Sequence, residues 1–146
     1  MKKLLLTLLF FTYSFYYSYS QLYTDKYIAD ANKIALNWLN DINHGNYESA
    51  YNILTKENKD LYPKEHWIKQ INQFMLEFGK IKNRAVISKN FTSSMEGMEN
   101  GFYVVIEYDS DYQKTINHKE LLILKQNDNM NWKILLYDNP NWSFIN

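Results

Sequence analysis

Apolar positions recur with a helical period in the first half of the chain, beginning just after residue 24. Eight apolar side chains fall within an arc of about 140° when successive residues are placed 100° apart. They are Tyr27, Ile28, Ala31, Ile34, Ala35, Trp38, Leu39 and Ile42. The pattern predicts a long amphipathic helix with Thr24 as its N-cap and with Gly45 in the left-handed conformation that ends helices.

Two further helices are expected before the midpoint of the chain. Asn46 can cap a short helix that carries Tyr47, Ala50, Tyr51 and Leu54, and the polar run 55–60 then predicts a connection. A third helix should begin near Pro63 and end at Gly79. Its apolar stripe consists of Trp67, Ile68, Ile71, Phe74, Met75 and Phe78.

After Gly79 the composition changes to that of β-strands. Four strands are predicted, at 82–91, 102–108, 121–124 and 132–137. The turn-forming pairs Asn100-Gly101 and Asp128-Asn129 favour antiparallel neighbours. Helices followed by strands indicate an α+β domain, with three N-terminal helices packed on one face of a four-stranded antiparallel sheet.

The first 20 residues have the pattern of a secretory signal peptide. Lys2 and Lys3 precede the apolar run 4–11, and Ser18 and Ser20 supply a small-x-small exit. Cleavage after Ser20 is expected, which leaves a single domain over residues 21–146 that is secreted or periplasmic. An uncleaved membrane anchor stays open as an alternative, because the exit is a poor one and aromatic residues extend the apolar stretch.

Composition narrows the classes of partner. The chain has no cysteine, so neither disulfides nor lipidation at the leader junction are expected. Without its two leader lysines the chain carries 14 basic and 16 acidic residues, a formal net charge of −2. This near balance predicts no nucleic-acid partner, and no stable membrane insertion is expected after cleavage.

The order of several residues resembles a known family. These residues are Ala35-x-x-Trp38-Leu39-x-x-Ile42-x-x-Gly45-x-Tyr47, then Trp67, Phe78-Gly79-x-x-x-x-Arg84, Phe102-Tyr103-Val104-Val105-x-x-Tyr108, Glu120 and Trp132-Lys133. The pattern resembles the short secreted bacterial proteins catalogued as domain of unknown function 4019, in which Leu-Gly is more usual at the position of Phe78-Gly79. The resemblance implies a cystatin-like or nuclear-transport-factor-like domain that is exported. It carries over no functional residues.

Candidate chemistry is sparse. The spacing of oxygen-bearing residues from Asp109 to Glu120 mimics a calcium-binding loop. However, Lys114 stands where that loop needs glycine, and the segments on both sides predict strands where helices are required. The alternative is a polar hairpin connection. His44, His66 and His118 lack the i, i+4 spacing of a helical zinc site. His44 is expected to be partly exposed near a helix C-terminus. No serine lies in a nucleophile elbow and no phosphate-binding loop is present, so no catalytic residue, metal or cofactor is predicted.

An apolar pocket between sheet and helices is the main candidate for a binding site. The residues that could line it are Trp38, Trp67, Tyr108, Trp132 and Tyr137, although aromatic residues at such spacings also make plain core. The leading hypothesis is a non-catalytic domain that binds a protein, a peptide or a small ligand.

Two alternatives stay open. One is a small isomerase or hydrolase that works by general acid/base catalysis, for which Asp41 and Glu107 are the nearest candidates. The other is self-association, as a homodimer, through an outer sheet face that is unusually apolar. That face consists of Tyr103, Val105, Leu121, Ile123 and Leu135.

Overall fold

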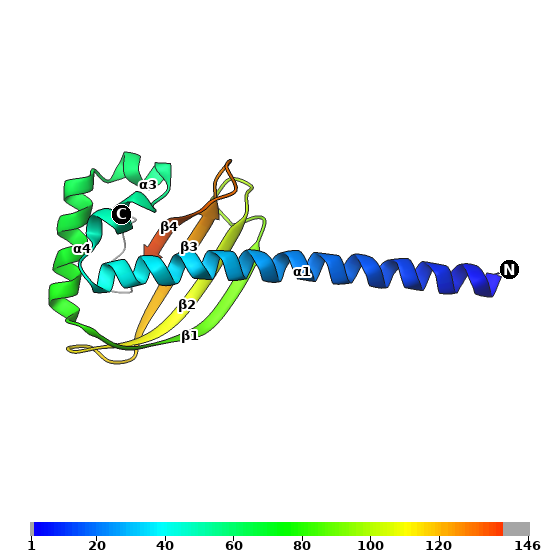
Figure 1. Ribbon diagram of the computed structural model, residues 1–146, viewed down its shortest axis with the longest axis horizontal. Coiled ribbons are helices and arrows are strands. Elements are labelled where there is room, and N and C mark those ends of the chain that lie inside the picture. Colours follow the sequence, from blue (N-terminus) through cyan, green and yellow to red (C-terminus); the bar gives the residue numbers. More distant parts are fainter. Residues whose placement is uncertain (1, 139–146) are drawn as a thin grey trace.

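The computed structural model describes the backbone of residues 2–138 and the side chains of residues 21–137, so Met1 and the last residues of the predicted domain, 139–146, lie outside it. Within the described part, four helices precede four strands (Figure 1). The helices are α1 (Lys2–Asn43), α2 (Tyr47–Asn52), α3 (Lys56–Leu61) and α4 (Lys64–Phe78). The strands are β1 (Ile81–Thr92), β2 (Tyr103–Tyr112), β3 (His118–Gln126) and β4 (Trp132–Asp138).

The strands form one antiparallel sheet in the order β1-β2-β3-β4. The prediction of an α+β domain with a four-stranded antiparallel sheet is therefore confirmed. The register aligns Arg84, Ser110 and His118 across three strands, while Tyr108 pairs with Val86 on one side and with Glu120 on the other. This alignment brings charged and hydroxyl side chains from distant parts of the sequence onto one face.

Helix α1 is longer than the sequence pattern predicted. It runs without interruption through Thr24, so the prediction that Thr24 is the N-cap is wrong, whereas Gly45 has a φ of 76° and follows the helix as predicted. Figure 1 shows α1 crossing the sheet and extending well beyond it at its N-terminal end. No helix within the described residues contains a stretch long and apolar enough to cross a membrane.

The number of helices also differs from the prediction, because the run expected to be a connection contains α3. Thr55 caps this helix, its hydroxyl accepting a hydrogen bond from the Asn58 backbone N–H at 3.3 Å. No side chain of α3 is buried, so the helix leaves no apolar stripe in the sequence. At α2, Asn46 holds the N-cap position, but its side chain donates to Asp41 at 3.4 Å and makes no cap hydrogen bond.

One core fills the space between the helices and the inner face of the sheet. The predicted stripes of α1 and α4 provide its helical side, and alternate residues of the strands provide the other. Helix α4 ends at Gly79, as predicted, with φ 74°. A Cβ at Gly79 would lie 3.0 Å from the Cβ of Gln113, so both conformation and space favour glycine there.

The outer face of the sheet carries a second, smaller apolar cluster. Tyr103, Ile123 and Leu136 are buried in it, and Met95 and Met98 from the β1–β2 connection pack against them. The Tyr103 hydroxyl donates to the Glu99 carbonyl at 2.7 Å, which fixes this connection to the sheet. The apolar residues of the outer face are thus covered, in part, by the chain's own β1–β2 connection.

Candidate functional site

Three of the aromatic residues predicted to line a pocket meet in the core. The ring centroid of Trp38 lies 6.4 Å from that of Trp67 and 5.2 Å from that of Tyr137. The Trp38 indole donates to the Ala50 carbonyl at 3.0 Å. The cavity left beside the three rings measures about 10 Å³, roughly the space of one water molecule. These rings therefore fill the core at this point.

The other two predicted pocket residues lie apart from that group. Trp132 packs near Tyr27 of α1, with ring centroids 6.1 Å apart. Tyr108 lies on the inner face of the sheet, 5.9 Å from the guanidinium carbon of Arg84. Its hydroxyl is buried without a hydrogen-bond partner among the described residues, and burial raises the pKa of Tyr108 to about 12. The five residues therefore do not surround one common cavity.

A buried ion pair joins Arg84 of β1 to Glu120 of β3. Arg84 Nε donates to Glu120 Oε2 at 2.7 Å and Nη2 donates to Oε1 at 3.2 Å, so the pair is bidentate. Glu120 also accepts hydrogen bonds from the hydroxyls of Tyr112, Tyr137 and Ser110. The Glu120 side chain is 0% exposed and that of Arg84 is 11% exposed. Every oxygen of this buried carboxylate is therefore satisfied.

The charges of this cluster are fixed near neutral pH. Burial alone would raise the pKa of Glu120, but hydrogen bonds and charge from Arg84, with further hydrogen bonds from Tyr112 and Ser110, hold it below its ordinary value. Burial and the neighbouring Glu120 carboxylate raise the pKa values of the Tyr112 and Tyr137 hydroxyls. An ionised carboxylate among protonated hydroxyls is suited to holding the four strands together rather than to exchanging protons.

Sequence reasoning did not identify this cluster. Arg84 and Glu120 both belong to the residues that carry the family resemblance, yet they lie on strands that are not neighbours in the sheet. The available signal was polar residues at inward-facing strand positions, where Ser110 and Tyr112 alternate with outward-facing residues of β2.

The histidines occupy structural positions. His44 is exposed at the end of α1, with Nδ1 2.8 Å from the Asn40 carbonyl oxygen, close to the predicted position. His118 is buried, and its ring centroid lies 4.7 Å from that of Phe78 and 6.1 Å from that of Tyr112. His118 therefore belongs to the aromatic packing where α4 meets the sheet.

The candidate calcium loop proves to be a β-hairpin. The segment from Asp109 to Glu120 forms the end of β2, a turn and the start of β3, so strands stand where a calcium loop of this type needs helices. Its two end carboxylates already bind cationic side chains. Glu120 pairs with Arg84, and Asp109 pairs with Lys119 at 2.8 Å. The polar-connection alternative is the correct one.

The two carboxylates considered for acid/base catalysis lie in separate places. Asp41 accepts a hydrogen bond from Ser49 at 2.7 Å and joins the end of α1 to α2. Glu107 is exposed on the outer face of the sheet, where it accepts a hydrogen bond from Ser88 at 2.9 Å. Across the described residues, no group of three or more His, Asp or Glu side chains is placed to hold a metal ion.

A concavity lies at one end of the sheet, and we call it the α3 groove. It is open to solvent and has a volume of about 820 Å³. Its walls are α3, the end of the β1–β2 connection and the β3–β4 hairpin, and its ionisable residues have both signs. They are Lys56, Lys59, Lys125, Lys133, Glu57, Asp60, Glu99 and Asp128. The groove contains none of the five aromatic residues predicted to line a pocket.

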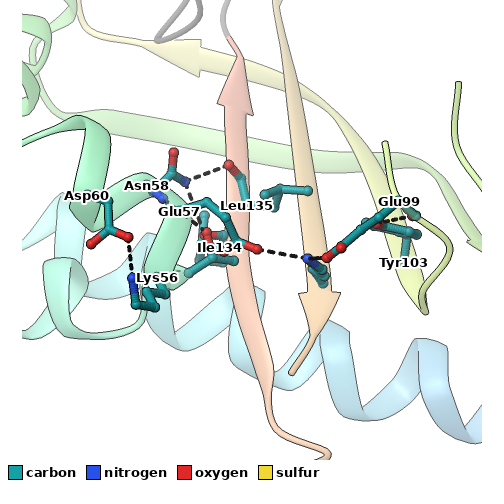
Figure 2. Close-up of polar contacts among 10 residues, drawn as sticks. Lys56, Glu57, Asn58, Asp60, Glu99, Tyr103, Ile134 and Leu135 are labelled. Atoms are coloured by element: carbon teal, nitrogen blue, oxygen red, sulfur yellow. Dashed lines mark hydrogen bonds and ion pairs between the residues drawn. The ribbon is translucent and has the colours of Figure 1, made fainter. Parts of the chain in front are cut away.

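Lys125 connects two walls of the α3 groove. Its ammonium donates to Glu57 Oε1 at 2.8 Å and also to the carboxylate of Glu99. Figure 2 shows Glu57 and Glu99 approaching each other from α3 and from the β1–β2 connection. The two carboxylates raise the pKa of Lys125, and the Lys125 ammonium lowers that of Glu57. Both groups are therefore ionised near neutral pH, and their ion pairs link α3 to the β1–β2 connection.

Two further lysines of the groove, Lys59 and Lys133, form no ion pair among the described residues. Lys59 is half-buried, its ammonium donates to the Asn52 carbonyl at 2.9 Å, and it lies 5.8 Å from the centroid of the Tyr51 ring. Burial, followed by the positive charge of Lys133, lowers the pKa of Lys59. Two cations that line one groove and act on each other, without an ion-pair partner in the described part of the chain, favour an anion at this wall.

Comparison with known proteins identifies the family. Residues 34–137 match the model of a family described as "Protein of unknown function (DUF4019)", and the chain belongs to that family. This confirms the resemblance found in the sequence. No curated protein and no solved structure matches the chain significantly.

Proposed function

We propose that this protein is an exported, non-catalytic domain that binds a small anionic ligand, or the carboxylate end of a peptide, in the α3 groove. The observation that carries the proposal is that Lys59 and Lys133 both line the groove, that the charge of Lys133 acts on Lys59, and that neither forms an ion pair among the described residues. An anionic group bound between them would relieve their mutual repulsion and so gain affinity.

The protonation states of the groove support binding rather than catalysis. A general acid or base works best with a pKa near the operating pH. In the α3 groove the pKa of Lys125 is raised and that of Glu57 is lowered, so these two shifts lead away from neutrality. The pKa of Lys59 is lowered instead, by burial and by the charge of Lys133, and a bound anion would oppose this shift. The buried carboxylate of Glu120 has its pKa lowered and its oxygens fully engaged, and the cavity near Tyr137 is only about 10 Å³.

The fold type and the location belong to the same proposal. Helices packed on one face of a four-stranded antiparallel meander support a cystatin-like or nuclear-transport-factor-like architecture. The cationic start and apolar run of residues 2–11 support export. Mass spectrometry of the protein purified from its native cells should find a chain beginning at Gln21. An intact leader would favour the anchor alternative and would contradict release from the membrane.

The proposed site is tested by comparing the binding of two peptides that differ only in the charge of the C-terminus. The probe is a short polyalanine peptide with a free C-terminal carboxylate, and the matched control is the same peptide with an amidated C-terminus. NMR shifts of backbone amides should change at Lys59, Gly101 and Lys133 with the first peptide, and change little with the second. Equal shifts with both peptides, or shifts confined to residues outside the groove, would refute the anionic site.

A pair of variants separates the groove from general surface charge. Lys133→Gln should weaken binding of the free-carboxylate peptide about three- to tenfold, because one charged contact at a partly exposed site contributes about 1 kcal/mol to the binding free energy. Lys69→Gln removes an exposed lysine of α4 outside the groove and should leave binding unchanged. Equal losses in the two variants would mean that the peptide responds only to net charge.

A further inference from the structure

The β4 edge of the sheet receives backbone hydrogen bonds from another part of the chain, whereas the β1 edge does not within the described residues. At the β4 edge, the Thr55 N–H donates to the Ile134 carbonyl at 2.9 Å and the Ile134 N–H donates to the Ile53 carbonyl at 3.0 Å. The side-chain amide of Asn58 donates to the carbonyls of Ile134 and Leu135 (Figure 2). Residues 53–58 thus cover this edge at Ile134 and Leu135.

The β1 edge is open. At 12 residues, β1 is the longest strand, and it pairs with β2 on one side. Within the described residues, no backbone hydrogen bond reaches its other side. Figure 1 shows β1 along the side of the sheet opposite to β4, away from α3. Two large apolar side chains are exposed along it, Val86 at 43% and Ile87 at 52%. Such an edge can accept an additional strand.

The charge of β1 indicates which kind of additional strand could pair with it. The run 80–92 contains no acidic residue, and its lysines, Lys80, Lys82 and Lys89, are exposed and form no ion pair among the described residues. Arg84 is already neutralised by Glu120. Pairing with a second copy would bring lysine-rich strands together, which is unfavourable. The irregularities near Ile81 and Val86 divide the ladder of any added strand into shorter stretches, so charge is what separates the possible partners.

We infer that β1 binds an extended, acidic segment of a different protein, which adds to the sheet as a fifth strand. Backbone hydrogen bonds along β1 supply affinity in this mode, and side chains supply specificity. Acidic side chains of the segment would face Lys82 and Lys89, and apolar ones would contact Ile87. This surface lies on the other edge of the sheet from the α3 groove, so either site can be present without the other.

The test uses the full chain and two designed peptides. One peptide alternates Glu and Val, the other alternates Lys and Val, and both have blocked termini. The Glu peptide should bind and slow amide hydrogen exchange within residues 81–92, whereas the Lys peptide should bind at least tenfold more weakly. The double variant Lys82→Glu, Lys89→Glu should reverse this preference.

A matched control keeps the net charge change equal. The double variant Lys33→Glu, Lys69→Glu alters exposed lysines of α1 and α4, outside β1, and it should keep the preference for the Glu peptide. The inference is overturned if the Glu peptide binds without protecting β1, or if both double variants behave alike. It is also overturned if β1 becomes protected as the protein concentration rises without peptide, because the edge would then pair with a second copy.

Discussion

The buried pair of Arg84 and Glu120 allows a quantitative prediction. Glu120→Gln keeps the shape of the side chain and still accepts hydrogen bonds, but it leaves the Arg84 guanidinium, 11% exposed, without a counter-ion. Removing one partner of a buried pair costs about 3–5 kcal/mol. We expect a loss near the lower end, about 3 kcal/mol, because Gln can still engage the hydroxyls of Tyr137 and Ser110.

Urea unfolding followed by tryptophan fluorescence measures this loss, since Trp38, Trp67 and Trp132 are buried in the core. A destabilisation of about 3 kcal/mol lowers the urea midpoint by roughly 1–3 M for a small domain. The matched control is Glu107→Gln, which removes an exposed carboxylate bonded to Ser88 and should change stability by less than about 0.5 kcal/mol.

Two measurements test the role of the Arg84–Glu120 pair in stability. If Glu120→Gln costs no more than Glu107→Gln, the pair is not an essential contact between β1 and β3. A double variant, Arg84→Met with Glu120→Leu, removes both charges and should recover more than half of the loss, because buried pairs can be replaced by apolar residues at little cost. Failure to recover would mean that the hydroxyl network, rather than the isolated charge, determines the cost.

Three further predictions follow from the same structure. The pKa of Glu120 is lower in the folded than in the unfolded chain. Its contribution to stability is therefore complete above about pH 4.3 and disappears as the pH falls through the folded-state pKa. In urea titrations at acid pH, the difference in stability between the native chain and Glu120→Gln should accordingly disappear. Gly79→Ala should lower the free energy of unfolding by about 1–2 kcal/mol in thermal unfolding, a larger loss than that of Gly97→Ala. Both glycines have positive φ, but of the two only Gly79 has other side chains, such as Gln113, within 4 Å of the added Cβ. Thr55→Ala should cost about 1 kcal/mol in the same assay, because it removes the cap of α3, and no loss would show that this helix does not depend on its cap.

The elements with a buried stripe were predictable from the sequence. Helix α4 buries Trp67, Ile71, Phe74 and Phe78 at helical spacing, and β2 alternates between the two faces of the sheet, so burial left a periodic pattern in each. Helix α3 buries no side chain and left no such pattern. The start of α1 was missed for another reason: Thr24 has the properties of a cap, but neighbouring residues on both sides continue the helix.

The sites were harder to predict than the fold. Arg84 and Glu120 meet only once the register of three strands is fixed, and no local spacing reports that register. The α3 groove is built from a solvated helix and the tips of two connections, whose residues carry no periodic signal. The aromatic residues that seemed the best candidates for a pocket, Trp38 and Tyr137 among them, were conspicuous because they pack the core.

The position of α1 has a consequence for the order of events during synthesis. This helix is translated first, yet it contacts all four strands, and Trp38 packs against Tyr137 at the far end of the chain. Its apolar face cannot be covered until the last strand has left the ribosome, so folding depends on contacts that are distant in sequence. If the chain is exported, as we propose, this topology would itself delay folding until synthesis is complete.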